Sequence, residues 1–105
     1  MASSAPDTTK LAWERYIFHN SEVKEKPIDQ KVFQEWILKN WPVLNGDSAL
    51  VAVVKIQDLL LKNYQKYCRT IIAFRKGTLN HTSFTGFKAK TAVSSLNHDF
   101  LIVIS

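Results

Sequence analysis

The sequence predicts a single α+β domain in which three N-terminal helices pack on a C-terminal antiparallel β-hairpin or three-stranded sheet. Apolar residues recur at helical spacing before Cys68, whereas β-branched and aromatic residues dominate the segments after it. A chain of 105 residues has room for one hydrophobic core. A content of 46% hydrophobic and 22% charged residues is typical of a chain that folds by itself.

The first predicted helix follows residues 1–7, which are small and polar and which we expect to be disordered, so that the domain spans residues 8–105. Three side chains near its start are suited to accept a backbone N–H as the cap: Asp7, Thr8 and Thr9. Apolar residues then recur at helical spacing up to about His19: Leu11, Trp13, Tyr16 and Ile17.

The second helix has the clearest boundaries in the chain and is predicted over residues 30–40. Asp29 is placed to cap it, and Ile28 before the cap is expected to pack on Phe33. The helix should end before Pro42, which disfavours helical geometry at the preceding residue. Its apolar stripe consists of Val32, Phe33, Trp36 and Ile37.

The third helix is predicted to run from a cap at Asp47 or Ser48 to about Tyr67. Its beginning, residues 49–54, is apolar all round, so a buried strand is the alternative there. From residue 55 onward one side is apolar, and the other carries a mostly basic ridge: Lys55, Asp58, Lys62, Lys66 and Arg69. A solvated helix with ordinary lysine–aspartate pairs would show the same pattern.

Three β-segments are predicted after this helix. Residues 70–74 are rich in β-branched and aromatic side chains and residues 84–93 alternate, so we expect these two segments to pair as a hairpin. Residues 100–104 form a continuous apolar run that is typical of a strand buried on both faces. Because an apolar terminal strand would leave an aggregation-prone edge, we favour a longer native protein of which this chain is the N-terminal part.

We expect a soluble protein of the cytoplasm or the nucleus, with no membrane contact. No apolar run approaches the roughly 18 residues that a membrane span requires, and the first residues do not have the pattern of a signal peptide. Cys68 is the only cysteine, so no internal disulfide can form. The glycosylation sequon at Asn80 is then expected to be a chance match.

The chain offers few residues for catalysis, and we predict that it is not an enzyme and binds no metal and no cofactor. Cys68 is expected to serve as a small buried hydrophobe rather than as a nucleophile. The neighbours His98 and Asp99 would point to opposite faces of an extended chain. The three histidines lie far apart in the sequence, and the three glycines build no phosphate-binding loop.

Positive charge is concentrated in the second half of the chain. Residues 1–49 hold six Lys/Arg and seven Asp/Glu, whereas residues 50–105 hold eight Lys/Arg and two Asp/Glu. Clustered cations attract phosphates at long range, so nucleic acid, either RNA or DNA, is the partner that we favour. The alternative is a basic face that only keeps the protein soluble.

We therefore predict a non-catalytic, regulatory module that contacts nucleic acid through the helical ridge and the hairpin. Phe84 would stack on bases unless it belongs to the core. The order of three helices, a strand, a basic turn and a strand is similar to a winged-helix arrangement, which is the alternative fold. The candidate binding residues are Lys62, Lys66, Arg69, Arg75, Lys76, Phe84, Lys88 and Lys90.

A protein–protein interaction, adaptor or oligomerisation domain is the competing prediction. The chain holds three tryptophans and three tyrosines, the residue types that dominate interface hot spots. Trp41, just outside the second helix, is the candidate anchor for a protein partner. The last strand, residues 100–104, offers a second route, since it could pair edge to edge with another chain or with a copy of itself.

Overall fold

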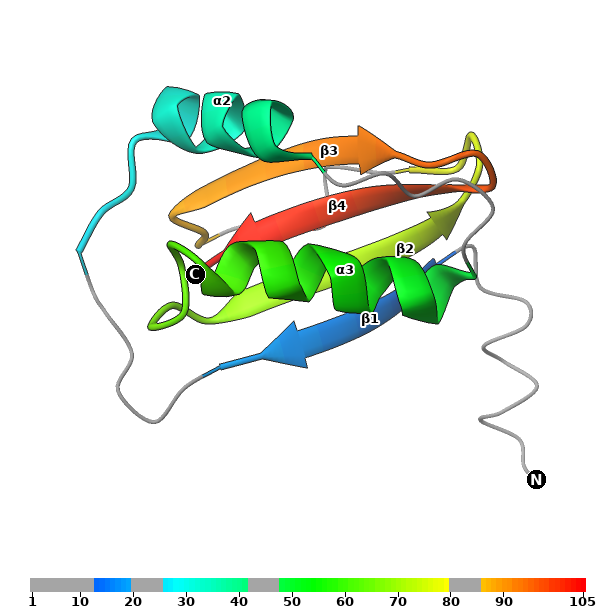
Figure 1. Ribbon diagram of the computed structural model, residues 1–105, viewed down its shortest axis with the longest axis horizontal. Helices are drawn as coiled ribbons and strands as arrows, with labels where there is room; N and C mark the ends of the chain where they lie inside the picture. The colour runs from blue at the N-terminus through cyan, green and yellow to red at the C-terminus, as the bar shows by residue number, and fades with distance from the viewer. Residues whose placement is uncertain (1–12, 20–25, 42–47, 80–85) are drawn as a thin grey trace.

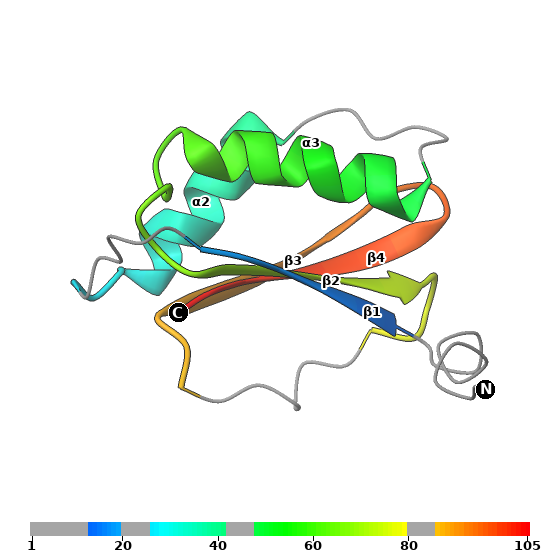
Figure 2. The same cartoon turned by 90° about the horizontal axis from the view of Figure 1, so that it is seen from below.

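The structure, a computed structural model, describes residues 13–19, 26–41, 48–79 and 86–105. Four strands form an antiparallel sheet in the order β1-β2-β4-β3, and two helices cover one of its faces (Figure 1 and Figure 2). Within these ranges no helix is long and apolar enough to cross a membrane. The elements are β1 (Trp13–Phe18), α2 (Gln30–Asn40), α3 (Ala49–Leu61), β2 (Arg69–Arg75), β3 (Ala89–Ser94) and β4 (His98–Ile104).

The predicted arrangement of three helices on a hairpin or three-stranded sheet is wrong, because the segment expected to form the first helix contains a strand. β1 pairs antiparallel with β2, from Trp13 opposite Phe74 to Phe18 opposite Arg69. Its aromatic and β-branched side chains favour a strand, although their spacing also fits a helix. The winged-helix alternative, which needs three helices, fails with it. The side chains proposed to cap and begin that helix lie outside the described residues: Asp7, Thr8, Thr9 and Leu11.

The second predicted helix is confirmed, with its predicted bounds and cap, as α2. The side chain of Asp29 accepts hydrogen bonds from two backbone amides of the first turn, at 2.9 and 3.1 Å. The inward side of α2 buries Phe33 and Ile37 completely, and Ile28 packs against the same core. The apolar spacing and the aspartate cap therefore act together to place this helix on the sheet.

α3 confirms the third predicted helix and excludes the strand alternative for residues 49–54. Ser48 caps it by accepting a hydrogen bond from the amide of Val51 at 3.3 Å. The helix ends at Leu61 rather than near Tyr67, because the chain then folds into a turn that leads to β2.

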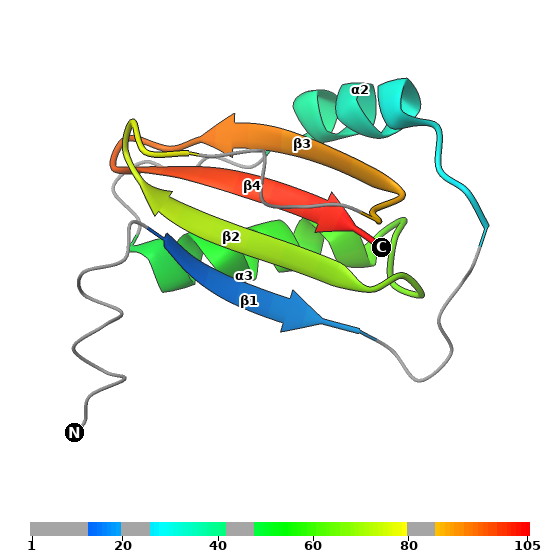
Figure 3. The same ribbon diagram turned by 180° about the vertical axis from the view of Figure 1, so that it is seen from behind.

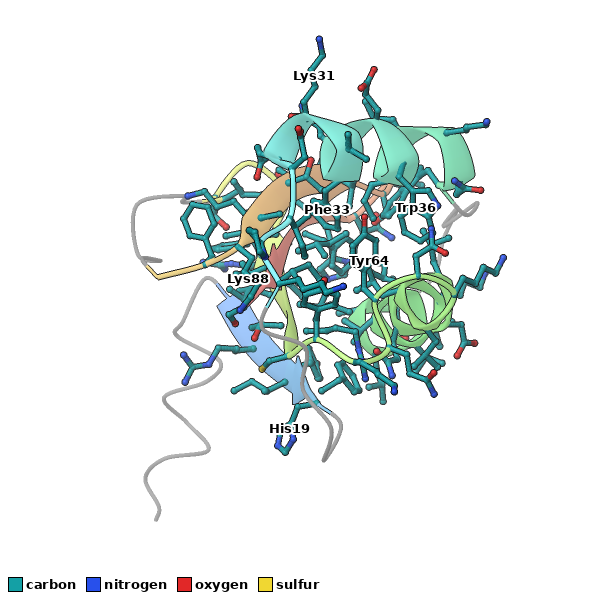
Figure 4. The ribbon with its side chains drawn as sticks, turned by 90° about the vertical axis from the view of Figure 1, so that its left-hand side faces the viewer. His19, Lys31, Phe33, Trp36, Tyr64 and Lys88 are labelled. Carbon is teal, nitrogen blue, oxygen red and sulfur yellow. The ribbon has the colours of Figure 1, made fainter. Side chains whose placement is uncertain are left out.

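This turn, residues 62–68, is held by aromatic packing. The ring of Tyr64 meets the rings of Phe33 and Trp36 edge-on, with centroids 5.2 Å apart in both cases (Figure 4). Tyr67 is also buried, and its ring lies 5.9 Å from that of Tyr64. The turn is thereby fixed against α2, although the two segments are far apart in the sequence.

The predicted hairpin between residues 70–74 and 84–93 is also wrong. β2 pairs with β1 and β4, whereas β3 pairs with β4, so the hairpin that forms joins β3 to β4. β2 and β3 consequently run parallel on either side of β4, since each is antiparallel to it. The prediction that residues 100–104 form a strand buried on both faces is confirmed, because β4 lies inside the sheet and these residues are buried.

The sheet has an apolar cluster on each face. The cluster under the helices includes Phe33, Ile56, Phe100 and Ile102, all completely buried. The second cluster lies on the face away from the helices, and this face is turned toward the viewer in Figure 3. It consists of Ile72, Phe74, Leu101 and Val103, with Leu79 packed against it. Neither face of β2 or β4 is therefore an open surface.

Candidate nucleic-acid interface

The strand register defines two ends of the sheet. One row across the four strands consists of Phe18, Arg69, Ile104 and Ala89. The turn 62–68 and residues 86–88 adjoin the sheet at this end, which we call the basic end. At the other end, which we call the Asp99 end, Phe74, Asp99 and Ser94 share a row and Arg75 lies opposite His98. The six positions from His98 to Ile104 along β4 correspond to about 20 Å.

Five lysines lie on the segments that form the basic end, which faces the viewer in Figure 4. Lys31 extends outward from the start of α2, and Lys88 immediately precedes β3 (Figure 4). Within residues 29–31, 62–68 and 86–91, all of which the structure describes, Asp29 is the one acidic side chain, and it caps α2. The local charge is therefore positive. The five lysines are Lys31, Lys62, Lys66, Lys88 and Lys90.

A groove of about 450 Å³ runs between α2 and the outer edge of β3 at this end. Phe87 presents an aromatic ring that is 37% exposed, and the ammonium of Lys90 lies 4.7 Å from the centre of this ring. The groove therefore combines cations, an aromatic face and amide groups. Its lining consists of Gln30, Gln34, Phe87, Lys88, Lys90, Thr91 and Ala92.

One side chain of α2 binds the backbone of β3 within this groove. Gln30 Nε2 donates to the backbone carbonyl oxygen of Lys90 at 2.6 Å, and the backbone N–H of Lys90 donates to Gln30 Oε1 at 2.9 Å. Both polar backbone groups of Lys90 therefore point away from β4. Since this direction repeats every second residue in an antiparallel strand, the N–H and C=O of Ala92 also point toward the groove.

Arg69, one of the predicted nucleic-acid contacts, is a buried structural residue with an exposure of 4%. Its guanidinium donates to Gln57 Oε1 at 3.1 Å and to the carbonyl oxygens of Tyr64 and Tyr67 at 3.2 Å each, as well as to that of Gln65. Burial lowers the pKa of Arg69, and the neighbouring Cys68 acts in the opposite direction. The arginine thus holds the turn 62–68 together.

Arg75 and Lys76, also predicted as contacts, lie at the Asp99 end. The ammonium of Lys76 is 3.2 Å from Asp99 Oδ1 and donates to the carbonyl oxygen of Ser95 at 3.0 Å. Asp99 also accepts from the Gly77 amide at 2.9 Å and from the Ser94 hydroxyl at 2.8 Å. Lys76 is thus part of a clip that joins the end of β2 to the β3–β4 turn.

The pKa of the Asp99 carboxyl lies below its ordinary value. Burial by itself raises this pKa, but the opposing contributions together outweigh it. They come from the hydrogen bonds of Gly77, Ser94 and Lys76 and from the charge of Lys76. The ionised carboxylate is therefore the form that the clip stabilises.

The structure thus divides the predicted contact residues among different places. Four lysines lie at the basic end: Lys62, Lys66, Lys88 and Lys90. Arg75 and Lys76 lie at the opposite end. Arg69 is inside, and Phe84 lies outside the described residues. The predicted basic hairpin does not exist as one surface, because the strands that were expected to form it do not pair.

The features proposed for a protein partner have different surroundings from those expected. Trp41 is partly buried and packs against the core under the helices. β4 is paired on both sides, so its backbone is not available as a sheet edge. Cys68 is partly exposed, and among the described residues no three His, Cys, Asp or Glu side chains gather as a metal site would require.

Of the residues that line the groove, sequence reasoning predicted only Lys88 and Lys90 as contacts, and it missed Gln30, Gln34 and Phe87 among others. The two glutamines are four positions apart, so they lie on one side of α2, a signal that could have been used. The alternation predicted for residues 84–93 does not extend to Phe87, because β3 begins only at Ala89.

Comparisons with known proteins do not assign the chain to a family. No family matches it, and neither a curated protein nor a solved structure does so. The chemistry of the basic end is consequently the basis on which a function can be argued.

Proposed function

We propose that this protein binds single-stranded nucleic acid, without catalysis, along the groove between α2 and β3 at the basic end. One observation carries the proposal: the exposed ring of Phe87 shares this groove with Lys88, Lys90 and the amides of two glutamines. Proteins that bind single strands combine a positive groove for the backbone with aromatic rings on which bases stack. The groove brings these groups together in one place.

Each kind of group has a separate role in the proposed complex. The lysines neutralise phosphates and release their counterions, which makes binding dependent on salt. Phe87 stacks on an unpaired base. Gln34 and the outward N–H and C=O of Ala92 provide donors and acceptors for the edge of that base.

The shape of the molecule favours a single strand over a duplex. Reading a DNA duplex requires a helix or a pair of strands that enters a groove of the nucleic acid. Here both helices lie flat on the sheet, with α2 and α3 packed against its strands (Figure 2). The groove at Phe87 suits a base that has left its stack.

The face of the sheet away from the helices is not the proposed surface. Ile72 and Leu101 at its centre are 0% exposed, and Leu79 packs on their cluster. Bases that stack on an open sheet need aromatic side chains exposed on its strands. These observations support the edge of β3 as the proposed binding surface.

The proposal is tested by fluorescence anisotropy with labelled RNA and DNA single strands and a duplex, over a series of salt concentrations. Binding should be tightest for a single strand and should weaken with salt, with a log–log slope of about −0.7 per phosphate contacted. The variant Phe87→Ala should weaken binding by about 5- to 150-fold, the range that stacking contributions span. Absence of binding to every probe at low salt would contradict the proposal.

The matched pair of variants is Lys88→Ala and Arg75→Ala, each of which removes one positive charge. Lys88→Ala should reduce the salt slope by about 0.7, whereas Arg75→Ala, at the Asp99 end, should leave affinity and slope unchanged. Equal losses in both variants would show that net charge alone drives the binding. Polyglutamate serves as the competitor, and its displacement of the oligonucleotide at equal charge concentration would indicate an acidic polypeptide ligand instead.

A further inference from the structure

The contact between Gln30 and Lys90 shows how the outer edge of β3 binds a planar amide. Gln30 Nε2 donates to the carbonyl oxygen of Lys90 at 2.6 Å, and the N–H of Lys90 donates to Gln30 Oε1 at 2.9 Å. One amide group, with its donor beside its acceptor, therefore satisfies both outward backbone groups of a single strand residue. We call this pair of hydrogen bonds the amide clasp.

Gln34 and Ala92 occupy corresponding positions one step further along. α2 and β3 begin at the same end of the sheet and run side by side in the same direction (Figure 1). Gln34 follows Gln30 by one helical turn, which advances it by about 6 Å. Ala92 follows Lys90 by two residues, which advances it by about 7 Å along the strand. Gln34 is thus placed along β3 at Ala92 nearly as Gln30 is at Lys90.

At this second position the clasp is open. In the part of the chain that the structure describes, no hydrogen bond joins Gln34 to Ala92, and both residues are exposed. Both line the groove of about 450 Å³, whose walls also carry the ring of Phe87. The outward N–H and C=O of Ala92 therefore face a space that a ligand can enter.

A nucleobase carries the arrangement of donor and acceptor that the amide clasp uses. On the edge that pairs in a duplex, each base has an N–H donor directly beside an acceptor, such as N3–H and O4 of uracil. Such an edge can bind the N–H and C=O of Ala92 as Gln30 binds those of Lys90. Duplex formation occupies this edge, so an unpaired base is the form that offers it.

An added peptide strand would use the edge of β3 differently. It would pair with the outward backbone groups of every second residue in succession, which are those of Lys90, Ala92 and Ser94. Gln30 already occupies the first of these residues. An open residue beside an aromatic ring therefore favours a single planar base over a peptide ladder.

We infer that the backbone of Ala92 binds the donor–acceptor edge of one unpaired base, so that a free edge is what selects single strands. The inference rests on the proposed function, because Phe87 and the lysines hold the strand in the groove. It adds a specific requirement. The groove accepts a base whose pairing edge is free and rejects a base whose edge is blocked.

The first test compares oligouridine with oligo(3-methyluridine) and oligo(5-methyluridine) of equal length by fluorescence anisotropy. A methyl group at N3 removes the donor of the edge, whereas one at C5 lies away from it. The N3 methyl should weaken binding by about 5- to 150-fold, the range that a bidentate base contact spans, and the C5 methyl should not. Equal binding of all three would overturn the inference and leave the proposed function standing. Failure of all three to bind would contradict both.

The second test removes the donor from the protein. Ala92→Pro deletes the outward N–H and no hydrogen bond between β3 and β4, a position at which an edge strand tolerates proline. Ala92→Val adds bulk but keeps the N–H, so it is the matched control. Ala92→Pro should bind oligouridine and oligo(3-methyluridine) equally, whereas Ala92→Val should retain the difference. A difference that persists in both variants would overturn the inference. Circular dichroism establishes that each variant is folded.

Amide hydrogen exchange of the unaltered protein gives a measurement that needs no variant. Without ligand the Lys90 amide should exchange more slowly than that of Ala92, because Gln30 accepts its hydrogen bond. Saturating oligouridine should slow exchange at Ala92 by at least about tenfold, and oligo(3-methyluridine) should not. An unchanged rate at Ala92 would contradict the proposed contact. Protection of Ala92 and Ser94 by polyglutamate but not by oligouridine would indicate an added peptide strand and would also overturn it.

Discussion

The two ends of the sheet use their positive charges in different ways. At the Asp99 end, Lys76 is bound to a carboxylate that also joins β2 to the β3–β4 turn. At the basic end, Arg69 is buried among backbone carbonyl oxygens, while Lys88 and Lys90 line a groove. The comparison teaches that a count of charges along the chain does not distinguish cations that support the fold from cations that can meet a ligand.

The largest effect on stability is expected at Arg69, which can be compared with Arg75 at the other end of β2. Arg69→Ala should lower the free energy of unfolding by about 3 kcal/mol or more, because it leaves several buried carbonyl oxygens without a donor. Arg75→Ala removes an exposed side chain at the other end of the same strand and should cost less than about 0.5 kcal/mol. Urea unfolding measures both values. Similar losses would mean that the contacts of Arg69 contribute nothing particular to stability.

The next effect concerns the clip at the Asp99 end. Its carboxyl has a lowered pKa, so the stability that it provides is present above about pH 4, the ordinary value, and is lost as pH falls through the lower pKa of the folded protein. Asp99→Asn should lower the free energy of unfolding at neutral pH by about 1 to 3 kcal/mol and should abolish this part of the acid dependence. Urea unfolding across a pH series checks the prediction, with Asp58→Asn on the exposed side of α3 as the control. An unchanged acid profile in Asp99→Asn would contradict it.

The smallest changes in stability are expected for two lysine variants, Lys76→Ala and Lys88→Ala. These variants should differ in their effect on oligonucleotide binding. Lys76→Ala should lower the free energy of unfolding by at most about 1 kcal/mol, since its ion pair is partly solvated, and should leave oligonucleotide binding intact. Lys88→Ala should change stability by less than about 0.5 kcal/mol but should weaken binding. Thermal unfolding and anisotropy on the same samples measure both quantities. The comparison between the two ends would fail if each variant changed both quantities equally.

The elements that sequence reasoning predicted correctly are those with local signals. The Asp29 cap and the apolar spacing of α2 lie within a few residues of each other, and the same holds for Ser48 and α3. The burial of β4 on both faces followed from its unbroken apolar run. These signals depend on side chains that are neighbours in the sequence, so a single chain is enough to identify them.

Strand order could not be obtained in this way, because pairing joins segments that are distant in the sequence. In β1 the residues Trp13, Tyr16 and Ile17 fit helical spacing, and the strand is recognised only through its pairing with β2. The groove was missed for the same reason, since Gln30 and Lys90 are 60 positions apart. Lys88 and Lys90 were identified by charge, but charge could not indicate that Arg69 is buried or that Lys76 is bound to Asp99.

The position of β4 between β2 and β3 also constrains the order in which the fold can be completed. β4 follows the other elements in the chain, yet it supplies the pairing partner of two strands that do not contact each other in its absence. During synthesis β3 must therefore emerge before it has a partner, with its backbone donors and acceptors unpaired. The sheet can close only when the β4 segment has left the ribosome, and until then the growing chain is exposed to misassociation at these strands.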